Sequence, residues 1–404
     1  MVAACAVPGR KPDRTARRSY AWEFQPLKIA LDTWVLAERF RHQGTSVYAR
    51  NLFQEFGKIA VHAPELRFCL FANGDQREAE FKSLPGFGTQ AAPLLTRHRL
   101  WRLGGASAAA SKAKADVLFA PVPAIYPRGR VPTVCTIHDA TPLLAPSHSG
   151  MVLWQQRWFL RAAVRRCRHI IAVSERSKFD LIEAFGLETS KISVVYNGVS
   201  KKLFNDLPAD EEKQRMLLAR LGVARPYIFH HGTIQPRKNL VRLIEAYRRL
   251  VHKNGNLDFK LVLVGPLGWG YGEVVRAAQA QGEGRVILAG ELEDRDLALL
   301  LKGASLVVIP SLYEGFCLPM VEAMASGVPV IAANTSCLPE ISGEALRYFD
   351  PLSIEDMAGC MQRVLESSEL RDALINQGKE QASKFDWGRC ARETLQILQQ
   401  NAYQ

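Results

Sequence analysis

Residues 310–343 decide the fold, and they read PSLYEGFCLPMVEAMASGVPVIAANTSCLPEISG. The apolar run 306–309 comes directly before them and predicts a buried strand. A short loop follows, and then a helix pattern over 318–326 that ends at a glycine and a proline. The apolar run 328–332 predicts a second strand. Strand, loop, helix and strand in this order form the unit of a parallel α/β sheet.

Two carboxylates lie in this unit, Glu314 in the loop and Glu322 eight residues later in the helix. Eight residues are slightly more than two helical turns, so both side chains can face the same cleft. Ligands of parallel sheets bind beyond the carboxyl ends of the strands, where loops and helix N-termini meet. The spacing alone does not separate this arrangement from a simpler one, in which Glu314 caps the helix and Glu322 faces solvent.

The stretch resembles the E-x7-E signature of the retaining, GT-B-type glycosyltransferases of family 4, with G-F-x-L-P between the acids and A-S-G-V-P-V-I-A after them. The resemblance implies that Glu314 is catalytic and bonds sugar hydroxyls, and that Glu322 binds ribose hydroxyls. Gly315 permits close backbone approach. The backbone N–H groups that would hold sugar and phosphate oxygens are those of Gly315, Phe316, Cys317 and Leu318.

A second segment, 232–239, reads GTIQPRKN, follows a strand pattern and begins a helix pattern. Arg237 and Lys238 thus lie where the helix dipole disfavours cations, which hints at an anionic ligand. A forked guanidinium beside a mobile ammonium suits a diphosphate. The segment also resembles the family's G-T-x-x-P-R-K-N, whose Arg and Lys neutralise the donor diphosphate. We therefore expect a nucleotide-diphosphate sugar as donor substrate, and no metal or other cofactor.

The first half of the chain offers His138 and Gly44. His138 ends an apolar strand pattern, and a lone histidine there is more often structural. The family places a cleft histidine at this point, which implies a catalytic role for His138, with Asp139 as a candidate to orient its ring. Gly44 and Thr45 resemble the family's glycine-rich loop near the donor phosphates, although this chain has one glycine where members often have more.

Strand and helix patterns alternate on both sides of segment 199–226, which is charged and reads as an irregular linker. We expect an α/β protein with two Rossmann-like parallel-sheet domains facing across a cleft, as in GT-B enzymes. The expected parts are a disordered basic tail (1–26), an acceptor-side domain (27–200), a nucleotide-sugar domain (201–385) and a C-terminal helix (386–404). The resemblance implies that this last helix crosses back to the first domain.

Composition excludes several classes of protein. The chain has 404 residues, 48% hydrophobic and 23% charged, which is typical of globular proteins. It has no apolar run long enough to span a membrane, no secretory signal pattern, no P-loop and no G-x-G-x-x-G. The eight cysteines show neither C-x-x-C nor zinc-site spacing and suit a reducing cytosol.

Positive charge is concentrated in the first half. Residues 1–200 hold 28 Lys and Arg against 15 Asp and Glu, a net of +13, whereas residues 201–404 hold 24 against 25. Basic residues recur with tryptophans here, which suits an anionic lipid surface. An equally acceptable alternative is a solvated arginine face beside a buried tryptophan face, and no nucleic-acid motif is present. The residues concerned are Arg97, Arg99, Trp101, Arg102, Trp154, Arg157, Trp158, Arg161 and Arg165.

The expected function is α-retaining transfer of a hexose, mannose from GDP-mannose, to a saccharide or lipid-linked acceptor in cell-surface polysaccharide or O-antigen biosynthesis. We expect a cytoplasmic protein that docks on the inner face of the membrane. Two alternatives stay open: a GT-B nucleotide-sugar 2-epimerase, which needs no acceptor, and a non-catalytic protein that binds sugar nucleotides on the same fold.

Overall fold

A computed structural model describes residues 26–37, 40, 43–72, 78–91, 101–126, 131–145, 150–208, 210–223, 225–253, 259–282 and 285–403. The tail predicted over 1–26 therefore lies outside the described residues, except for Pro26. None of the described helices has the length and apolar character that a membrane crossing requires.

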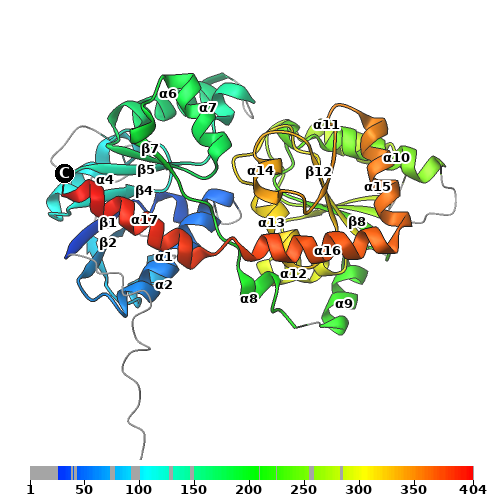
Figure 1. Cartoon of the computed structure of the whole chain (residues 1–404), viewed down its shortest axis with the longest axis horizontal. Helices are drawn as coiled ribbons and strands as arrows, with labels where there is room; N and C mark the ends of the chain where they lie inside the picture. Colours follow the sequence, from blue (N-terminus) through cyan, green and yellow to red (C-terminus); the bar gives the residue numbers. More distant parts are fainter. Residues whose placement is uncertain are drawn as a thin grey trace, which may run out of the picture.

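The first domain is a parallel sheet of seven strands in the order β3-β2-β1-β4-β5-β6-β7 (Figure 1). Its central strands are buried along their whole length, as continuous apolar runs in parallel sheets are. The strands are β1 (Leu27–Leu31), β2 (Leu66–Ala72), β3 (Phe87–Ala91), β4 (Val117–Ala120), β5 (Thr133–Ile137), β6 (His169–Ala172) and β7 (Ile192–Val194). The helices are α1 (Gly44–Ala60), α2 (Glu78–Lys82), α4 (Ala106–Lys112), α5 (Thr141–Leu144), α6 (Gly150–Arg166) and α7 (Glu175–Phe185).

The second domain is a parallel sheet of six strands in the order β10-β9-β8-β11-β12-β13. Its strands are β8 (Tyr227–His231), β9 (Lys260–Val264), β10 (Val286–Gly290), β11 (Leu306–Ile309), β12 (Val330–Ala333) and β13 (Arg347–Phe349). Its helices are α8 (Lys201–Phe204), α9 (Glu211–Leu221), α10 (Leu240–Lys253), α11 (Gly272–Gln279), α12 (Asp294–Lys302), α13 (Leu318–Ala325), α14 (Leu338–Ser342), α15 (Ile354–Glu366) and α16 (Ser368–Ser383). The segment with the two glutamates forms β11, α13 and β12, as predicted.

In both sheets the strand order reverses beside the first strand of the domain, between β1 and β4 and between β8 and β11. Loops diverge at such a switch point and leave a crevice at the carboxyl ends of the strands. Gly44 lies in the connection after β1, at the first switch point, and His138 follows β5, the strand next to β4. The segment with Arg237 follows β8 and the loop with Glu314 follows β11, the two strands of the second switch point. The topology therefore brings both sets of predicted residues to the facing edges of the two sheets.

The last helix, α17 (Trp387–Ala402), returns to the first domain (Figure 1). Its residues Leu395 and Leu398 are fully buried in the core of that domain, next to α1. At the crossing, a Cβ on Gly198 would lie 2.2 Å from the backbone nitrogen of Trp387, so only glycine fits there. The predicted return of the C-terminal helix is thus confirmed.

The prediction of an irregular linker over 199–226 is wrong in one respect. Most of this segment is helical and belongs to the second domain, because α9 buries Leu217 and Leu218 in that domain's core. Asp210 caps α9 by accepting a hydrogen bond from the Lys213 N–H, and Gly222 ends the helix in the left-handed conformation. The many charges of α9 hid this narrow apolar face. The exact domain limits at residues 200 and 385 stay predictions.

Candidate active site

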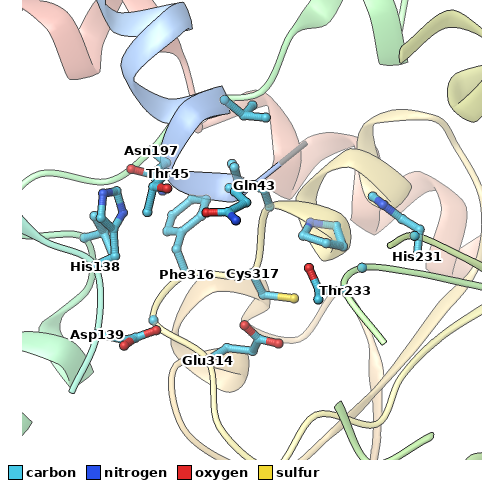
Figure 2. A pocket seen from close by; sticks show the side chains of 18 of the residues that line it. Gln43, Thr45, His138, Asp139, Asn197, His231, Thr233, Glu314, Phe316 and Cys317 are labelled. Atoms are coloured by element: carbon cyan, nitrogen blue, oxygen red, sulfur yellow. The ribbon is translucent and has the colours of Figure 1, made fainter. Parts of the chain in front are cut away.

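A cavity of about 1110 Å3 lies between the two domains. The first domain lines it with the start of α1 and the residues after β5, and the second domain with the residues after β8, β9, β10 and β11. Figure 2 shows His138 and His231 at opposite sides of this view, with Glu314 and Cys317 between them. All the site residues predicted from the sequence line this cavity: Gly44, His138, Arg237, Lys238, Glu314, Gly315, Phe316, Cys317, Leu318 and Glu322.

Glu314 binds both predicted diphosphate cations directly. Its Oε2 lies 2.8 Å from Nη1 of Arg237, and its Oε1 accepts a hydrogen bond of 2.6 Å from Nζ of Lys238. Burial would raise the pKa of Glu314, but the charges of Arg237 and Lys238 outweigh it and hold that pKa well below the ordinary value. The alternative that Glu314 caps α13 is excluded, since the carboxylate is bonded to the two cations and Cys317 occupies the N-cap position.

Glu322 projects from α13 into the cavity, and its Oε2 lies 3.2 Å from Nε2 of His231. Burial raises the pKa of Glu322 to about 8, and the charge of Asp294 adds to the rise. Burial lowers the pKa of His231 to about 3, with His230 and Lys238 contributing. At neutral pH this buried pair is therefore mostly uncharged. The alternative of a solvated Glu322 is excluded, because only 12% of its side chain is exposed.

The loop between the two glutamates presses against the first domain. A Cβ on Gly315 would lie 1.9 Å from the carbonyl oxygen of His138, so this position requires glycine. Phe316 packs against Tyr196 and Phe385, with ring centroids 6.5 and 5.4 Å away. Cys317 has a left-handed φ of +68° and turns the chain into α13. The first N–H groups of a helix lack intrahelical acceptors, so this turn directs donors into the cavity.

His138 is held in a fixed orientation by the first domain. Its Nε2 lies 2.9 Å from the carbonyl oxygen of Pro121, so this nitrogen carries the proton, and the ring packs edge-on against Tyr48. Burial lowers the pKa of His138, so the ring is neutral near pH 7. The expectation that Asp139 orients the ring is wrong: Oδ1 of Asp139 accepts the Thr141 N–H instead. Its charge does raise the pKa of His138, against the effect of burial.

Gly44 is the first residue of α1 and borders the cavity. A Cβ built there meets no protein atom within 4 Å, so the space beside it is open. Its neighbours Gln43 and Thr45 line the same cavity and are labelled in Figure 2. Further along α1, Arg50 forms a 3.1 Å ion pair with Asp294 of the second domain, and both residues line the cavity. The helix α1 therefore contacts the second domain across the cavity.

Among the cavity residues that sequence reasoning missed are His231 and Asn197. Asn197 was interpreted as part of a simple turn, but its side chain is 3% exposed and lines the cavity, and among the described residues its Oδ1 has no hydrogen-bond partner. Both residues end or follow a strand at the cleft edge of their sheet, and this placement was the available signal. His231 was hidden because it continues the buried strand β8.

Of the residues predicted to form a basic and aromatic surface, some are exposed and others are not. Arg97 and Arg99 lie outside the described residues. Trp101 is buried and donates a 2.7 Å hydrogen bond to Asp32, and Arg102 lies over the rings of Trp34 and Phe159, so neither forms an outer surface.

On α6, by contrast, Trp154 and Trp158 are 62% and 42% exposed and stack on each other. The alternative of a buried tryptophan face is therefore excluded for this helix. Arg161 and Arg165 are exposed, whereas Arg157 is half-buried and donates to the carbonyl oxygen of Pro142.

Comparison with known proteins shows the family. The model of Glycosyltransferase Family 4 matches residues 42–203, and that of Glycosyl transferases group 1 matches residues 220–381. The O-antigen chain mannosyltransferase B of Escherichia coli is 30% identical over 276 residues, which cover 67% of this chain and 69% of that protein. The MMP alpha-(1->4)-mannosyltransferase of Mycolicibacterium hassiacum is 28% identical over 66% of this chain and 65% of that protein. The serotype-specific mannosyltransferase WbdA of E. coli is 28% identical, but the match spans only 34% of its length.

Solved structures share the fold. Anabaena HepE in complex with UDP and glucose has a TM-score of 0.70 at 21% identity, and the match covers 93% of this chain and all of that chain. WaaG, a glycosyltransferase involved in lipopolysaccharide biosynthesis, has a TM-score of 0.68 at 16% identity, over 92% of this chain and 99% of that chain. At such identities the likeness concerns the fold, which is GT-B in both. The two family models and the E. coli relative place this chain in family 4 of the glycosyltransferases, as an enzyme of the hexosyltransferase type.

Proposed function

We propose that this enzyme transfers mannose from GDP-mannose, with retention of the α-configuration, to a saccharide or lipid-linked acceptor of a cell-surface polysaccharide. The observation that carries the proposal is the contact of Glu314 with Arg237 and Lys238, in a cavity that His138 closes from the other domain. Mannose is favoured because the E. coli and M. hassiacum relatives are named mannosyltransferases.

In this proposal, Arg237 and Lys238 bind the donor diphosphate and stabilise its charge as it departs, so no metal is required. The diphosphate takes over the two cations, and the Glu314 carboxylate then becomes available to the hydroxyls of the sugar. The proposed ribose ligand is Glu322. The N–H groups of residues 315–318 would hold sugar and phosphate oxygens at the start of α13.

Retention is proposed to occur on the front face of the sugar. The double displacement of retaining glycosidases uses a pair of carboxylates, one as nucleophile and one as general acid. Among the described residues, Glu314 has two cations beside it rather than a second carboxylate, and the proposal assigns it to the sugar hydroxyls. The departing diphosphate would help to deprotonate the acceptor hydroxyl. His138 is neutral, and because its Nε2 carries the proton, its Nδ1 can accept a hydrogen bond from a substrate hydroxyl.

A thermal-shift screen of GDP, UDP and their sugars tests the donor, since a ligand that binds only the folded state raises Tm. We expect the largest shift with GDP and GDP-mannose. Incubation of GDP-mannose with and without an oligosaccharide acceptor separates the alternatives. Product formed only with acceptor, and with α-linkage by NMR, supports the transferase. An epimerised sugar nucleotide without acceptor supports the 2-epimerase, and binding without turnover supports a non-catalytic protein.

We also propose that α6 docks on the inner, cytoplasmic face of an anionic membrane and delivers a lipid-linked acceptor. Trp154 and Trp158 share one helix face with the exposed apolar Met151, at i,i+3 and i,i+4 spacing. Amphipathic aromatic rings flanked by arginines suit the lipid headgroup region. The opposite side of α6 lines the cavity with Gln156, Phe159 and Leu160. One helix thus spans from the proposed membrane contact to the proposed acceptor side.

Sedimentation with vesicles of phosphatidylcholine, alone or with phosphatidylglycerol, tests this contact. We expect salt-sensitive binding to the anionic vesicles and its loss in the Trp154→Ser/Trp158→Ser double variant. Phe179→Ser is a matched control, since Phe179 is an exposed aromatic on the neighbouring helix α7. Equal sedimentation with and without anionic lipid would contradict the proposal.

A further inference from the structure

The helix α7 of the first domain is bonded along its first turns to the loop that carries Glu314. The hydroxyl of Ser174 donates a 2.6 Å hydrogen bond to the carbonyl oxygen of Gly315, and that of Ser177 donates to the same oxygen at 3.3 Å. One turn later, the Tyr313 hydroxyl donates a 2.6 Å hydrogen bond to Asp180. The polar side chains that make these bonds are all buried.

Glu340 completes this contact from the second domain. It lies in α14, and its Oε1 and Oε2 accept the backbone N–H groups of Glu175 and Arg176 at 2.7 and 2.9 Å. These two N–H groups belong to the first turn of α7, where no intrahelical acceptor exists. The helix dipole further favours a carboxylate at this end. Figure 1 shows α7 on the first domain and α14 on the facing edge of the second.

The helix α7 already has a cap within its own domain. The Ser174 hydroxyl accepts the N–H of Ser177 at 3.0 Å, so the helix does not need Glu340 in order to begin at residue 175. The carboxylate of Glu340 therefore binds two N–H groups whose position depends on how the domains sit together. The charge of Glu340 also affects Tyr196, which packs against Phe316 of the second domain. Burial raises the pKa of the Tyr196 hydroxyl, and Glu340 raises it further.

We propose that Glu340 is a positioning residue, whose bonds to the start of α7 set the domain arrangement in which the Glu314 loop meets His138. At this arrangement the backbone of Gly315 lies against the His138 carbonyl with no room for a side chain. A small rotation between the domains would separate these surfaces, and with them the two halves of the cavity. Glu340 itself does not line the cavity, so it acts on the reaction only through this arrangement.

The inference rests on the proposed donor site, and two measurements on the full chain test it. We expect Glu340→Ala to enlarge the radius of gyration in small-angle scattering, because the domains separate more often. We also expect it to lower kcat with GDP-mannose about tenfold or more, since misplaced reacting groups lose rate steeply. The KM for the donor and the Tm should change little, because the donor contacts and the Ser174 cap are intact.

Two variants make the test specific. Glu340→Gln keeps one oxygen that can accept an N–H, so it should recover part of the lost kcat. Glu344→Ala removes an exposed carboxylate four residues away in the chain and should behave as wild type in both measurements. A loss of kcat that came from reduced surface charge alone would appear in the Glu344 variant as well.

The outcomes separate this inference from the proposed function. A Glu340→Ala protein with wild-type kcat, or with a wild-type radius of gyration, would overturn the positioning role. The scattering measurement needs no donor, so it tests the domain contact even if GDP-mannose is not turned over. A different result would overturn the proposed donor and leave the positioning role intact. In that case the wild-type enzyme does not turn over GDP-mannose, but Glu340→Ala still enlarges the radius of gyration.

Discussion

The second domain lines its side of the cavity with bonded charges, whereas the first domain contributes a neutral histidine and the open start of a helix. Glu314 lies within 3 Å of two cations, and burial strengthens each of these attractions. His138, on the other side, bonds a backbone carbonyl and is uncharged near pH 7. Gly44 borders open space. The proposed function accounts for this difference, since it places the charged diphosphate at the second domain and the uncharged acceptor hydroxyl at the first.

The largest expected effect comes from Glu314→Ala, which breaks the charged side of the comparison. The variant leaves Arg237 and Lys238 buried without their anion, which costs stability on the order of 3 kcal/mol. It should still fold, and turnover should fall about a hundredfold or more, because a group that stabilises the transition state is lost. Rate measurements at saturating GDP-mannose check the loss.

The same variant offers a second measurement. A diphosphate can replace the missing carboxylate between the two cations, so GDP should raise the Tm of Glu314→Ala by more than it raises that of the wild type. Glu344→Ala, which removes an exposed acid, serves as the control. Wild-type turnover in Glu314→Ala would refute the role assigned to this carboxylate.

Next in size is Arg237→Gln, which tests whether the cations serve the diphosphate. Losing one charge-assisted donor should weaken GDP about tenfold or more, since such hydrogen bonds contribute about 1.5–3 kcal/mol. Binding of guanosine, which has no phosphate, should not change. Calorimetric titrations with both ligands give the comparison, and Arg249→Gln, outside the cavity, is the control. Equal weakening of GDP and guanosine would mean that Arg237 supports the pocket as a whole.

The variant His138→Ala tests the first domain's side of the cavity, which holds the neutral histidine. We expect kcat to fall about tenfold to a hundredfold, in line with the lower range for groups that assist proton transfer or orientation. The Kd for GDP should stay unchanged, because no charge on the donor side is touched. His169→Ala, a histidine of the same sheet outside the cavity, controls for packing. A loss of GDP affinity similar to the loss of rate would place His138 on the donor side instead.

The smallest expected effect is a pH dependence due to Glu322. Its pKa of about 8 in the folded chain exceeds the ordinary 4.5, so the folded protein holds a proton that the unfolded chain releases. This contribution to stability is complete below pH 4.5 and is lost as the pH rises through about 8. His231 acts oppositely: with a pKa lowered from 6.5 to about 3, its contribution is present above pH 6.5 and is lost as the pH falls through about 3.

Between pH 6.5 and 8 the contribution of Glu322 to the free energy of unfolding changes with pH, whereas that of His231 is constant. Tm measured across this window should fall with pH in the wild type and fall less in Glu322→Gln, whose amide does not titrate. Glu273→Gln, at an exposed acid of α11, should keep the wild-type slope. Identical slopes in all three proteins would show that Glu322 is already ionised at neutral pH.

Much of the donor side could be predicted because its signals are local. The apolar runs and the residues between them specify β11, α13 and β12 in order, and both glutamates follow from their places in that unit. The sequence signals were weaker for the cavity residues of the first domain, His138 and Gly44. A single histidine at a strand end and a single glycine before a helix are common features of parallel sheets, so the resemblance alone supported their roles.

The errors share one cause. Trp101 and Arg102 carry the residue types of a surface that binds lipid, yet Trp101 is buried and bonded to Asp32, and the half-buried Arg102 lies over two aromatic rings from other elements. Segment 199–226 has the charge of a linker, yet α9 packs against α12 and places two leucines in the core of the second domain. The composition of a segment indicates how favourably it interacts with water, but not which other elements cover it after folding.

The sequence by itself determined the two parallel sheets, the stretch with the paired glutamates and the cation pair, because periodicity and motif spacing are properties of nearby residues. Only the tertiary structure decided that Glu314 holds the cations, that His231 faces Glu322, and that Glu340 bonds α7. These contacts join residues that are far apart in the chain. Burial then sets their charge states, since it is the packing around each group that penalises its charged form.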